Sequence, residues 1–130
     1  MMYLLDTNVC IDFAKARSEI LRARIRAQNG RGMGISSITL AELRFGAQRP
    51  GGDREDEARI DLFVSVLGVH DFGRRAAEVY GGFARTLSVR RNSLDRLIAA
   101  HALALQATLI TNNETDFRDV PGLKVENWTR

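Results

Sequence analysis

Two short apolar runs in this chain end abruptly in polar segments that contain an acid. Residues 3–5 are apolar and stop at Asp6, after which apolar residues recur at helical spacing. Near the other end, the apolar residues 109–111 lead into the polar residues 112–117, which include Asp116. A short apolar run that stops at a polar switch is typical of a buried strand. Ligands of open α/β sheets collect outside the carboxyl ends of the strands, so both acids are candidates for a site.

The rest of the chain alternates between apolar runs of strand length and longer helical patterns. We expect further strands at residues 33–36, 69–71 and 123–125, and helices at residues 20–28, 38–46, 55–67, 73–90 and 92–106. This alternation predicts a doubly wound α/β domain with a mostly parallel sheet. With 130 residues the chain is expected to form a single domain, residues 1–130, with a core of its own.

Two more acids, Glu42 and Asp95, lie near the starts of helices that follow loops on the same expected edge of the sheet. Three of the four acids have an ordinary structural interpretation. Asp6 or Thr7 could simply cap the first helix. Glu42 could form a salt bridge with an arginine, either Arg44 or one from elsewhere in the chain. Asp95 could complete a capping box if Asn92 is the N-cap.

The four acids together suggest a different interpretation, which is a metal site. Carboxylates without accompanying Cys or His ligands favour a hard cation such as Mg²⁺ or Mn²⁺ over zinc. Such sites catalyse phosphoryl transfer, in which the cation activates water and stabilises charge while a phosphodiester bond breaks.

The composition is that of an ordinary globular protein, and its excess of arginine favours anionic partners. Hydrophobic residues make up 45% and charged residues 27%, and no apolar run approaches the roughly 18 residues of a membrane span. The net charge is +3, and all basic residues except Lys15 and Lys124 are arginines. Arginine forks match phosphate geometry, although a codon bias would enrich arginine equally. The single cysteine and the absence of a signal-peptide pattern predict a cytoplasmic protein.

Several other reactive side chains are better explained by structure. Cys10 lies in an apolar helical pattern and is expected in the core, Asp12 falls inside the first helix, and nothing places a second ligand beside His70. A second acidic group is interpreted as favourable charge at a helix N-terminus; it consists of Asp53, Glu55, Asp56 and Glu57.

Four segments resemble the PIN-domain nucleases, and in particular the VapC-type toxins of type II toxin–antitoxin pairs. They are LLDTN at residues 4–8, ISSITLAEL at residues 35–43, DRLIAAHA at residues 95–102 and TNNETDF at residues 111–117. The closing VPGLKVENW at residues 120–128 matches the usual ending of the family. The resemblance covers essentially the whole chain and keeps the family's order and spacing.

The resemblance implies a PIN-like three-layer fold with a five-stranded parallel sheet flanked by helices, and a Mg²⁺-dependent endoribonuclease in which Mn²⁺ can substitute. By resemblance, Asp6 and Asp95 bind the metal directly, while Glu42 and Asp116 complete the site directly or through water. The matching polar positions, which would orient the acids or contact RNA, are Thr7, Asn8, Thr111 and Asn113.

The same resemblance implies partners. A VapB-type antitoxin would inhibit the toxin by laying a C-terminal segment, often with an arginine, across the acidic groove. The toxin would form a homodimer within a larger toxin–antitoxin complex, DNA would be bound only through the antitoxin, and no membrane would be involved.

One segment departs from the family pattern. Many relatives have a turn with Gly or Pro before the third acid, whereas this chain has Arg90-Arg91-Asn92-Ser93-Leu94, whose arginines could contact RNA phosphate.

Two alternative functions are weaker. A signalling receiver would need an acidic neighbour for Asp6 and a lysine at a strand end, but Lys124 follows the last turn. A catalytically dead relative that only binds nucleic acid is disfavoured because all four acids are present.

Overall fold

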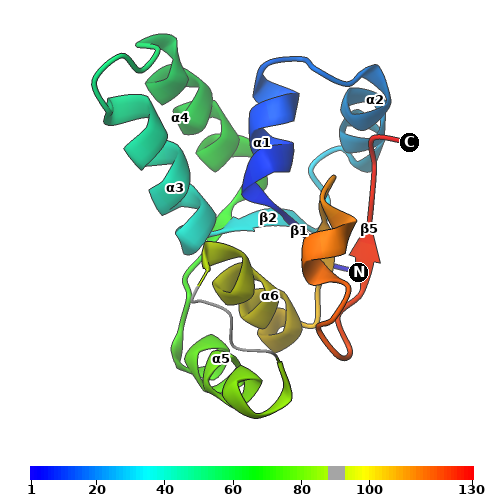
Figure 1. Cartoon of the computed structure of the whole chain (residues 1–130). Coiled ribbons are helices and arrows are strands. Elements are labelled where there is room, and N and C mark those ends of the chain that lie inside the picture. Colours follow the sequence, from blue (N-terminus) through cyan, green and yellow to red (C-terminus); the bar gives the residue numbers. More distant parts are fainter. Residues whose placement is uncertain (88–92) are drawn as a thin grey trace.

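The computed structural model describes residues 1–87 and 93–130, which fold around one parallel sheet (Figure 1). The strands are β1 (Tyr3–Leu5), β2 (Met33–Ser36), β3 (Val69–His70), β4 (Thr108–Ile110) and β5 (Val125–Glu126). Their order is β3-β2-β1-β4-β5, and each neighbouring pair is parallel. The predicted five-stranded parallel sheet is therefore confirmed.

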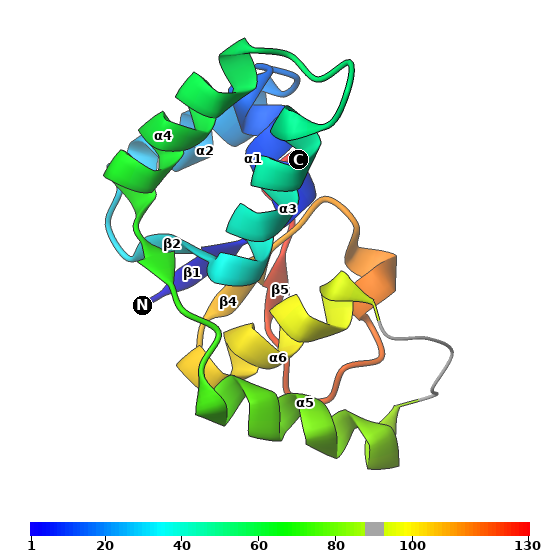
Figure 2. The ribbon, with the colours of Figure 1, turned by 90° about the vertical axis from the view of Figure 1, so that its left-hand side faces the viewer.

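Helices cover both faces of the sheet and complete three layers. They are α1 (Thr7–Ala14), α2 (Glu19–Gln28), α3 (Ser37–Gln48), α4 (Glu55–Leu67), α5 (Arg74–Thr86) and α6 (Leu94–Leu105), with a short 3₁₀ helix, η1 (Glu114–Phe117). Figure 2 shows α1–α4 on one side of the sheet and α5 and α6 on the other. None of the helices within the described ranges has the length and apolar character that crossing a membrane requires.

Successive residues of the central strands supply the two halves of the core, because side chains of a strand alternate between its faces. Leu5 and Ile110 belong to the cluster formed with α1–α4, whereas Leu4 and Leu109 belong to the cluster formed with α6. All four side chains are fully buried. A strand buried on both faces reads as a continuous apolar run, which is why β1 and β4 stand out in the sequence.

Serine side chains begin three of the helices. Ser18 accepts a hydrogen bond from the backbone N–H of Leu21 at 3.1 Å, and Ser36 accepts one from Ile38 at 3.0 Å. Ser93 accepts one from Arg96 at 3.2 Å and is the N-cap of α6. The capping-box interpretation of Asp95 is therefore wrong: α6 is capped one residue later than Asn92, so Asp95 is the second helical residue and not the third.

Several predicted boundaries differ from the structure by one or more residues, among them the end of α5 and the position of the last strand. Helix α5 ends at Thr86 and not at residue 90, because the backbone of Leu87 is extended. The last strand is formed by residues 125–126 and not 123–125, because the pairing with β4 is between Leu109 and Val125 and between Ile110 and Glu126. The predicted end of the helix at residue 90 and the cap at Asn92 lie outside the described residues.

The strand order places a topological switch at the centre of the sheet. β1 pairs with β2 on one side and with β4 on the other, so the chain leaves the middle strand in opposite directions. The crevice outside the carboxyl ends of such strands is the usual ligand site of an open α/β sheet. The residues after β1, β2 and β4 are therefore the ones to examine.

We expect Leu109→Ala to lower the free energy of unfolding by about 3 kcal/mol, because the substitution leaves a cavity in a fully buried strand. Urea unfolding measures the change. Leu62→Ala is the matched control, because Leu62 is 66% exposed and its loss should change stability by no more than about 0.5 kcal/mol. Equal effects of the two substitutions would contradict this account of the core.

Candidate functional site

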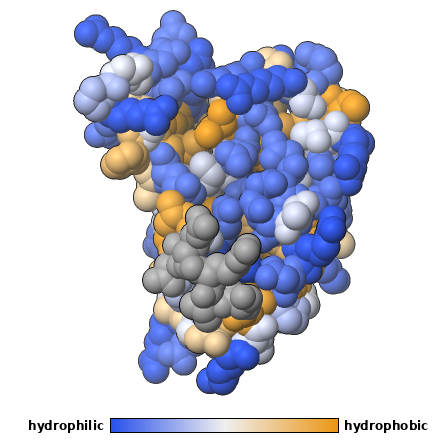
Figure 3. All heavy atoms as spheres, in the orientation of Figure 1, coloured by the Kyte–Doolittle hydropathy of each residue, from blue (hydrophilic) through white to orange (hydrophobic). Residues whose placement is uncertain are grey.

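The four acids singled out in the sequence lie on four different elements that touch in series. Asp6 is the N-cap of α1, Glu42 lies on α3, Asp95 is in the first turn of α6 and Asp116 is on η1. Helix α1 contacts α3, α3 contacts α6, and α6 contacts η1. In the view of Figure 3, hydrophilic residues fill the middle of the face onto which these elements open. The structure therefore brings the four acids to one edge of the sheet.

Asp6 is the most tightly held of them. It is only 2% exposed, and its two carboxylate oxygens have different partners. Oδ1 accepts from the backbone N–H of Thr7 at 2.7 Å, and Oδ2 accepts from the hydroxyl of Thr111 at 2.8 Å. The interpretation of Asp6 as a helix cap is thus correct, but the cap uses one oxygen only. The second oxygen joins the end of β1 to the end of β4.

Glu42 is oriented by threonines and not by a cation. The hydroxyl of Thr7 donates to Glu42 Oε1 at 2.7 Å and lies 3.1 Å from the hydroxyl of Thr39. The predicted salt bridge between Glu42 and Arg44 is wrong: Arg44 binds Glu57 at 2.8 Å and Asp61 at 2.9 Å on α4. Residues two apart on a helix point in different directions, which explains the difference.

Asp95 and Asp116 form the more open side of the group. Asp95 is half-buried, whereas Asp116 is exposed and accepts a hydrogen bond from the side-chain amide of Asn113. The backbone N–H of Asn113 in turn donates to the Thr111 hydroxyl at 3.0 Å. Thr111 and Asn113 therefore link Asp6 to Asp116, while Asn8 is exposed at the start of α1.

The acids affect one another's protonation. Burial raises the pKa of Asp6 to about 6; the hydrogen bonds from Thr111 and Thr7 oppose the rise, and the charges of Asp95 and Glu42 add to it. Burial also raises the pKa of Glu42, and the charge of Asp95 adds to that rise. The pKa of Asp95 is raised by burial and then by Asp116.

No ion pair between described residues involves Asp6, Glu42, Asp95 or Asp116. Within residues 1–87 and 93–130, no three His, Cys, Asp or Glu side chains are arranged as a ready-made metal site. The donor chemistry nevertheless fits a hard divalent cation, because the group offers only oxygen ligands and its members repel one another. A cation would relieve that repulsion.

Sequence reasoning missed three buried polar residues beside the acids. Thr39 contacts Thr7, and Ser36 joins the start of α3 to His101 on α6. Ser36 Oγ already accepts from the N–H of Ile38, so its hydrogen is available to His101 Nδ1 at 2.8 Å. Burial lowers the pKa of His101, and His70 lowers it further. The signal for these residues was a Ser, a Thr and a His inside otherwise apolar motifs.

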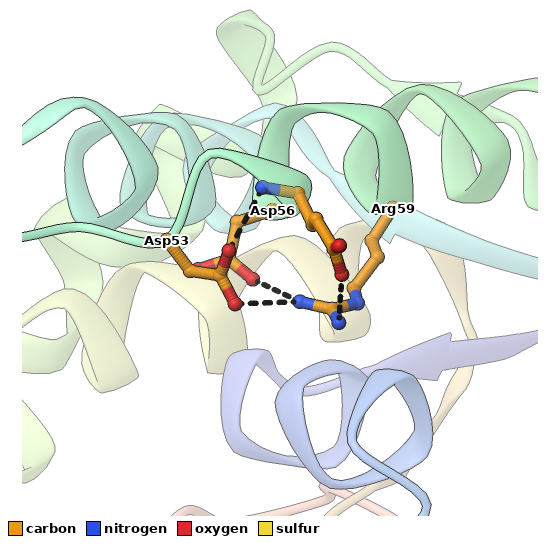
Figure 4. Close-up of polar contacts among 4 residues, drawn as sticks. Asp53, Asp56 and Arg59 are labelled. Carbon is orange, nitrogen blue, oxygen red and sulfur yellow. Dashed lines mark hydrogen bonds and ion pairs between the residues drawn. The ribbon is translucent and has the colours of Figure 1, made fainter.

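The second acidic group has a structural role, as predicted, although Asp56 and Arg59 line the same cavity as Glu42. Three of its members surround one guanidinium: Arg59 binds Asp53 at 3.2 Å, Asp56 at 2.8 Å and Glu55 at 3.0 Å (Figure 4). The fourth, Glu57, binds Arg44. These contacts secure the first turn of α4.

The remaining structural interpretations also agree with the structure. Cys10 is fully buried, and burial raises the pKa of its thiol. Asp12 accepts hydrogen bonds from Arg17 and Asn112. His70 packs directly against Gly34, where an added Cβ would lie 2.7 Å from its Nε2. The predicted RNA contact of Arg90 and Arg91 falls outside the described residues.

Asp6→Asn should stabilise the metal-free protein at neutral pH. In the folded state the pKa of Asp6 is about 6, which is above its ordinary value of 3.8. Ionisation of Asp6 therefore lowers the free energy of unfolding by about 3 kcal/mol above pH 6, whereas below pH 4 the carboxyl group is protonated and there is no such loss. We expect the stability gain of Asp6→Asn to grow as the pH rises from about 4 to about 6. Urea unfolding across this range measures it.

Glu78→Gln, at an exposed position of α5, is the matched control for the loss of one carboxylate. A gain for Asp6→Asn that is the same at pH 4.5 and pH 7.5 would contradict the assignment of a raised pKa.

Comparisons with known proteins agree with this architecture. Residues 3–123 match the family model described as the PIN domain. The chain is 34% identical to ribonuclease VapC2 of Rickettsia felis, with all of both chains covered, and 35% identical to the tRNA(fMet)-specific endonuclease VapC of Salmonella typhimurium, with 98% of each covered.

Among solved structures, the chain superposes on a chain of the promoter-DNA complex of VapBC2 from Rickettsia felis with a TM-score of 0.88 and 32% identity, covering 98% of this chain and 99% of that one. The superposition on a chain of DNA-bound VapBC from Salmonella typhimurium has a TM-score of 0.87 and 35% identity, with 98% of each chain covered. The chain belongs to the PIN-domain family and, within it, to the VapC-type proteins.

Proposed function

We propose that this chain is the toxin of a type II toxin–antitoxin module and a metal-dependent endoribonuclease that hydrolyses RNA phosphodiester bonds. The observation that carries the proposal is the grouping of four carboxylates, from four elements, whose charges interact in series from Asp6 and Glu42 through Asp95 to Asp116. The names of the relatives, a ribonuclease and a tRNA endonuclease, support cleavage of RNA.

Asp6 and Asp95 are proposed as direct ligands of Mg²⁺, for which Mn²⁺ could substitute, and Glu42 and Asp116 as ligands that act directly or through water. The bound cation would supply an activated water and would stabilise negative charge on the phosphate. Carboxylates with raised pKa values suit this role, because a divalent cation replaces the protons that they otherwise tend to keep.

The chain's own hydrogen bonds would preorganise the site. Thr111 holds Asp6, Thr7 holds Glu42, and Asn113 holds Asp116, so three of the four acids have fixed orientations before substrate arrives. Preorganised ligands bind a cation without first having to be ordered. Asn8 is exposed, which suits a contact with RNA rather than with the acids.

The proposed partner is a VapB-type antitoxin that blocks the site, and it alone would contact DNA. Solved relatives are VapBC complexes, two of them bound to DNA. We further propose a homodimer of the toxin within the complex and a cytoplasmic location.

A groove between α1, α2 and α4 suits the antitoxin. It has a volume of about 590 Å³ and its wall includes Phe13, Ile25, Phe63 and Val66. Arg22 also lines this groove, and its buried Nε has no hydrogen-bond acceptor among the described residues. An unpaired buried donor is costly, so a partner that brings an acceptor would be favoured. The groove is proposed to take an amphipathic segment with apolar side chains and one acidic or carbonyl group for Arg22.

Asp95→Asn should abolish RNA cleavage while leaving the fold intact. Asp95 is in the first turn of α6 but does not cap it, and the amide keeps its size while losing the charge that holds the cation. We expect cleavage in Mg²⁺ or Mn²⁺ to fall by at least about 100-fold, with the melting temperature nearly unchanged. Gel analysis of RNA cleavage, with EDTA as the metal-free reference, measures the loss.

Glu78→Gln serves again as the charge-matched control and should retain full cleavage. Cleavage by Asp95→Asn at the wild-type rate, or by the wild type in EDTA, would contradict the proposed metal site.

Val66→Lys should weaken antitoxin binding by about 10-fold or more, because it places a charge in the apolar groove. Isothermal titration calorimetry with the cognate antitoxin measures the dissociation constant. Phe45→Lys is the matched control: Phe45 is 77% exposed on α3 and does not line the groove. An unchanged affinity for Val66→Lys would exclude the groove as the docking surface.

A further inference from the structure

An arginine lies immediately beside the acid site and is held by an aspartate that does not belong to it. Arg96 follows Asp95 on α6, and Asp119 lies just beyond η1, which carries Asp116. The guanidinium of Arg96 donates from Nη1 to Asp119 Oδ1 and from Nη2 to Asp119 Oδ2, both at 2.8 Å. This is the bidentate arrangement in which arginine pairs most strongly with a carboxylate.

The charges of the site act on this guanidinium. The hydrogen bond to Asp119 contributes most to raising the pKa of Arg96, and the charges of Asp95 and Asp116 raise it as well. The side chain of Arg96 is 19% exposed, whereas that of its partner Asp119 is 51% exposed. Arg96 is thus attracted towards the same carboxylates that would bind the cation.

A guanidinium and a divalent cation are competitors for clustered carboxylates. An arginine fork can neutralise two neighbouring acids as a metal does, and its charge cannot be removed by deprotonation. Arg96 directly follows Asp95, and its guanidinium lies near enough to Asp95 and Asp116 for their charges to act on it. Some contact must therefore hold the guanidinium of Arg96 away from Asp95 and Asp116.

We propose that Asp119 holds Arg96 off Asp95 and Asp116, and so keeps the carboxylate site open to a divalent cation. Asp119 is a positioning residue in this scheme and touches neither metal nor substrate. The inference rests on the proposed metal-dependent nuclease and identifies a determinant of its metal affinity.

The pair could instead act only as a clamp that fastens η1 to the start of α6. Both schemes use the same two hydrogen bonds, but they differ in what happens when Arg96 is removed together with Asp119. If Asp119 acts by holding Arg96, then deleting the arginine removes the need for the aspartate. If the pair is a clamp, the double substitution is as damaging as either single one.

The test compares Asp119→Asn, Arg96→Gln and the double variant with the wild type. Mn²⁺ affinity of each full-length protein is measured by titration calorimetry. We expect Asp119→Asn to weaken Mn²⁺ binding by about 10-fold, Arg96→Gln to leave it unchanged or tighter, and the double variant to recover to the level of Arg96→Gln. Asp61→Asn is the matched control, because Asp61 on α4 also binds an arginine, Arg44, at 2.9 Å.

A second measurement follows Arg96 itself. In the metal-free Asp119→Asn protein, the NMR signal of the Arg96 Nε–H group should shift from its wild-type position and should move again when Mg²⁺ displaces the side chain. In the wild type this signal should barely respond to Mg²⁺. Raising the salt concentration should reduce the defect of Asp119→Asn, because the competing contact is electrostatic.

Each outcome separates this inference from the proposed function. A wild type that binds Mn²⁺ while Asp119→Asn binds it equally well, or a double variant as weak as Asp119→Asn, overturns the role of Asp119 alone. A wild type that binds no divalent cation overturns the proposed metal site and this inference with it.

Discussion

A buried carboxylate at the tip of the central strand is the constraint on which the other features of the site depend. Asp6 is 2% exposed, and its charge is tolerated because one oxygen caps α1 and the other is bonded by Thr111. These two contacts fix α1 and the end of β4 relative to β1. Thr7, the next residue, then orients Glu42 on α3. The acids are therefore positioned by the strand ends and helix starts of the sheet, without help from a described cation.

The arrangement divides the charged residues of the protein into two populations. Away from the site, arginines and acids satisfy each other, as Arg59 does with three carboxylates and Arg44 with two. Such exposed pairs contribute little each to stability. At the site, Asp6, Glu42 and Asp116 have threonine or asparagine donors, which orient a carboxylate without neutralising it. Neutral donors would suit the proposed cation site better than a resident arginine would.

Much of the fold could be predicted from the sequence, because the central strands β1 and β4 are buried on both faces and read as continuous apolar runs. The helical pattern after Asp6 was also informative, because it indicated structural roles for Cys10 and Asp12. Contacts between segments that are far apart in the sequence were harder to predict. The partner of Glu42 was mistaken, because local spacing suggested Arg44 whereas the true donor, Thr7, lies 35 residues away. The hydrogen bond between Ser36 and His101 joins residues 65 positions apart, and no periodic pattern in the sequence predicts it. The cap of α6 was displaced by one residue, because Asn92 and Ser93 are both good caps.

The pairing of β1 with β4 has a consequence for the order of events during synthesis. Asp6 emerges near the start of the chain, but its hydrogen bond to Thr111 spans 105 residues, and Asp116 comes later still. A nascent chain that has been released as far as Leu105 therefore holds Asp6, Glu42 and Asp95 but neither Thr111 nor Asp116. Long-range parallel pairing of this kind also forms late in folding. The acid group is complete only once Thr111, 105 residues after Asp6, and Asp116 have both left the ribosome.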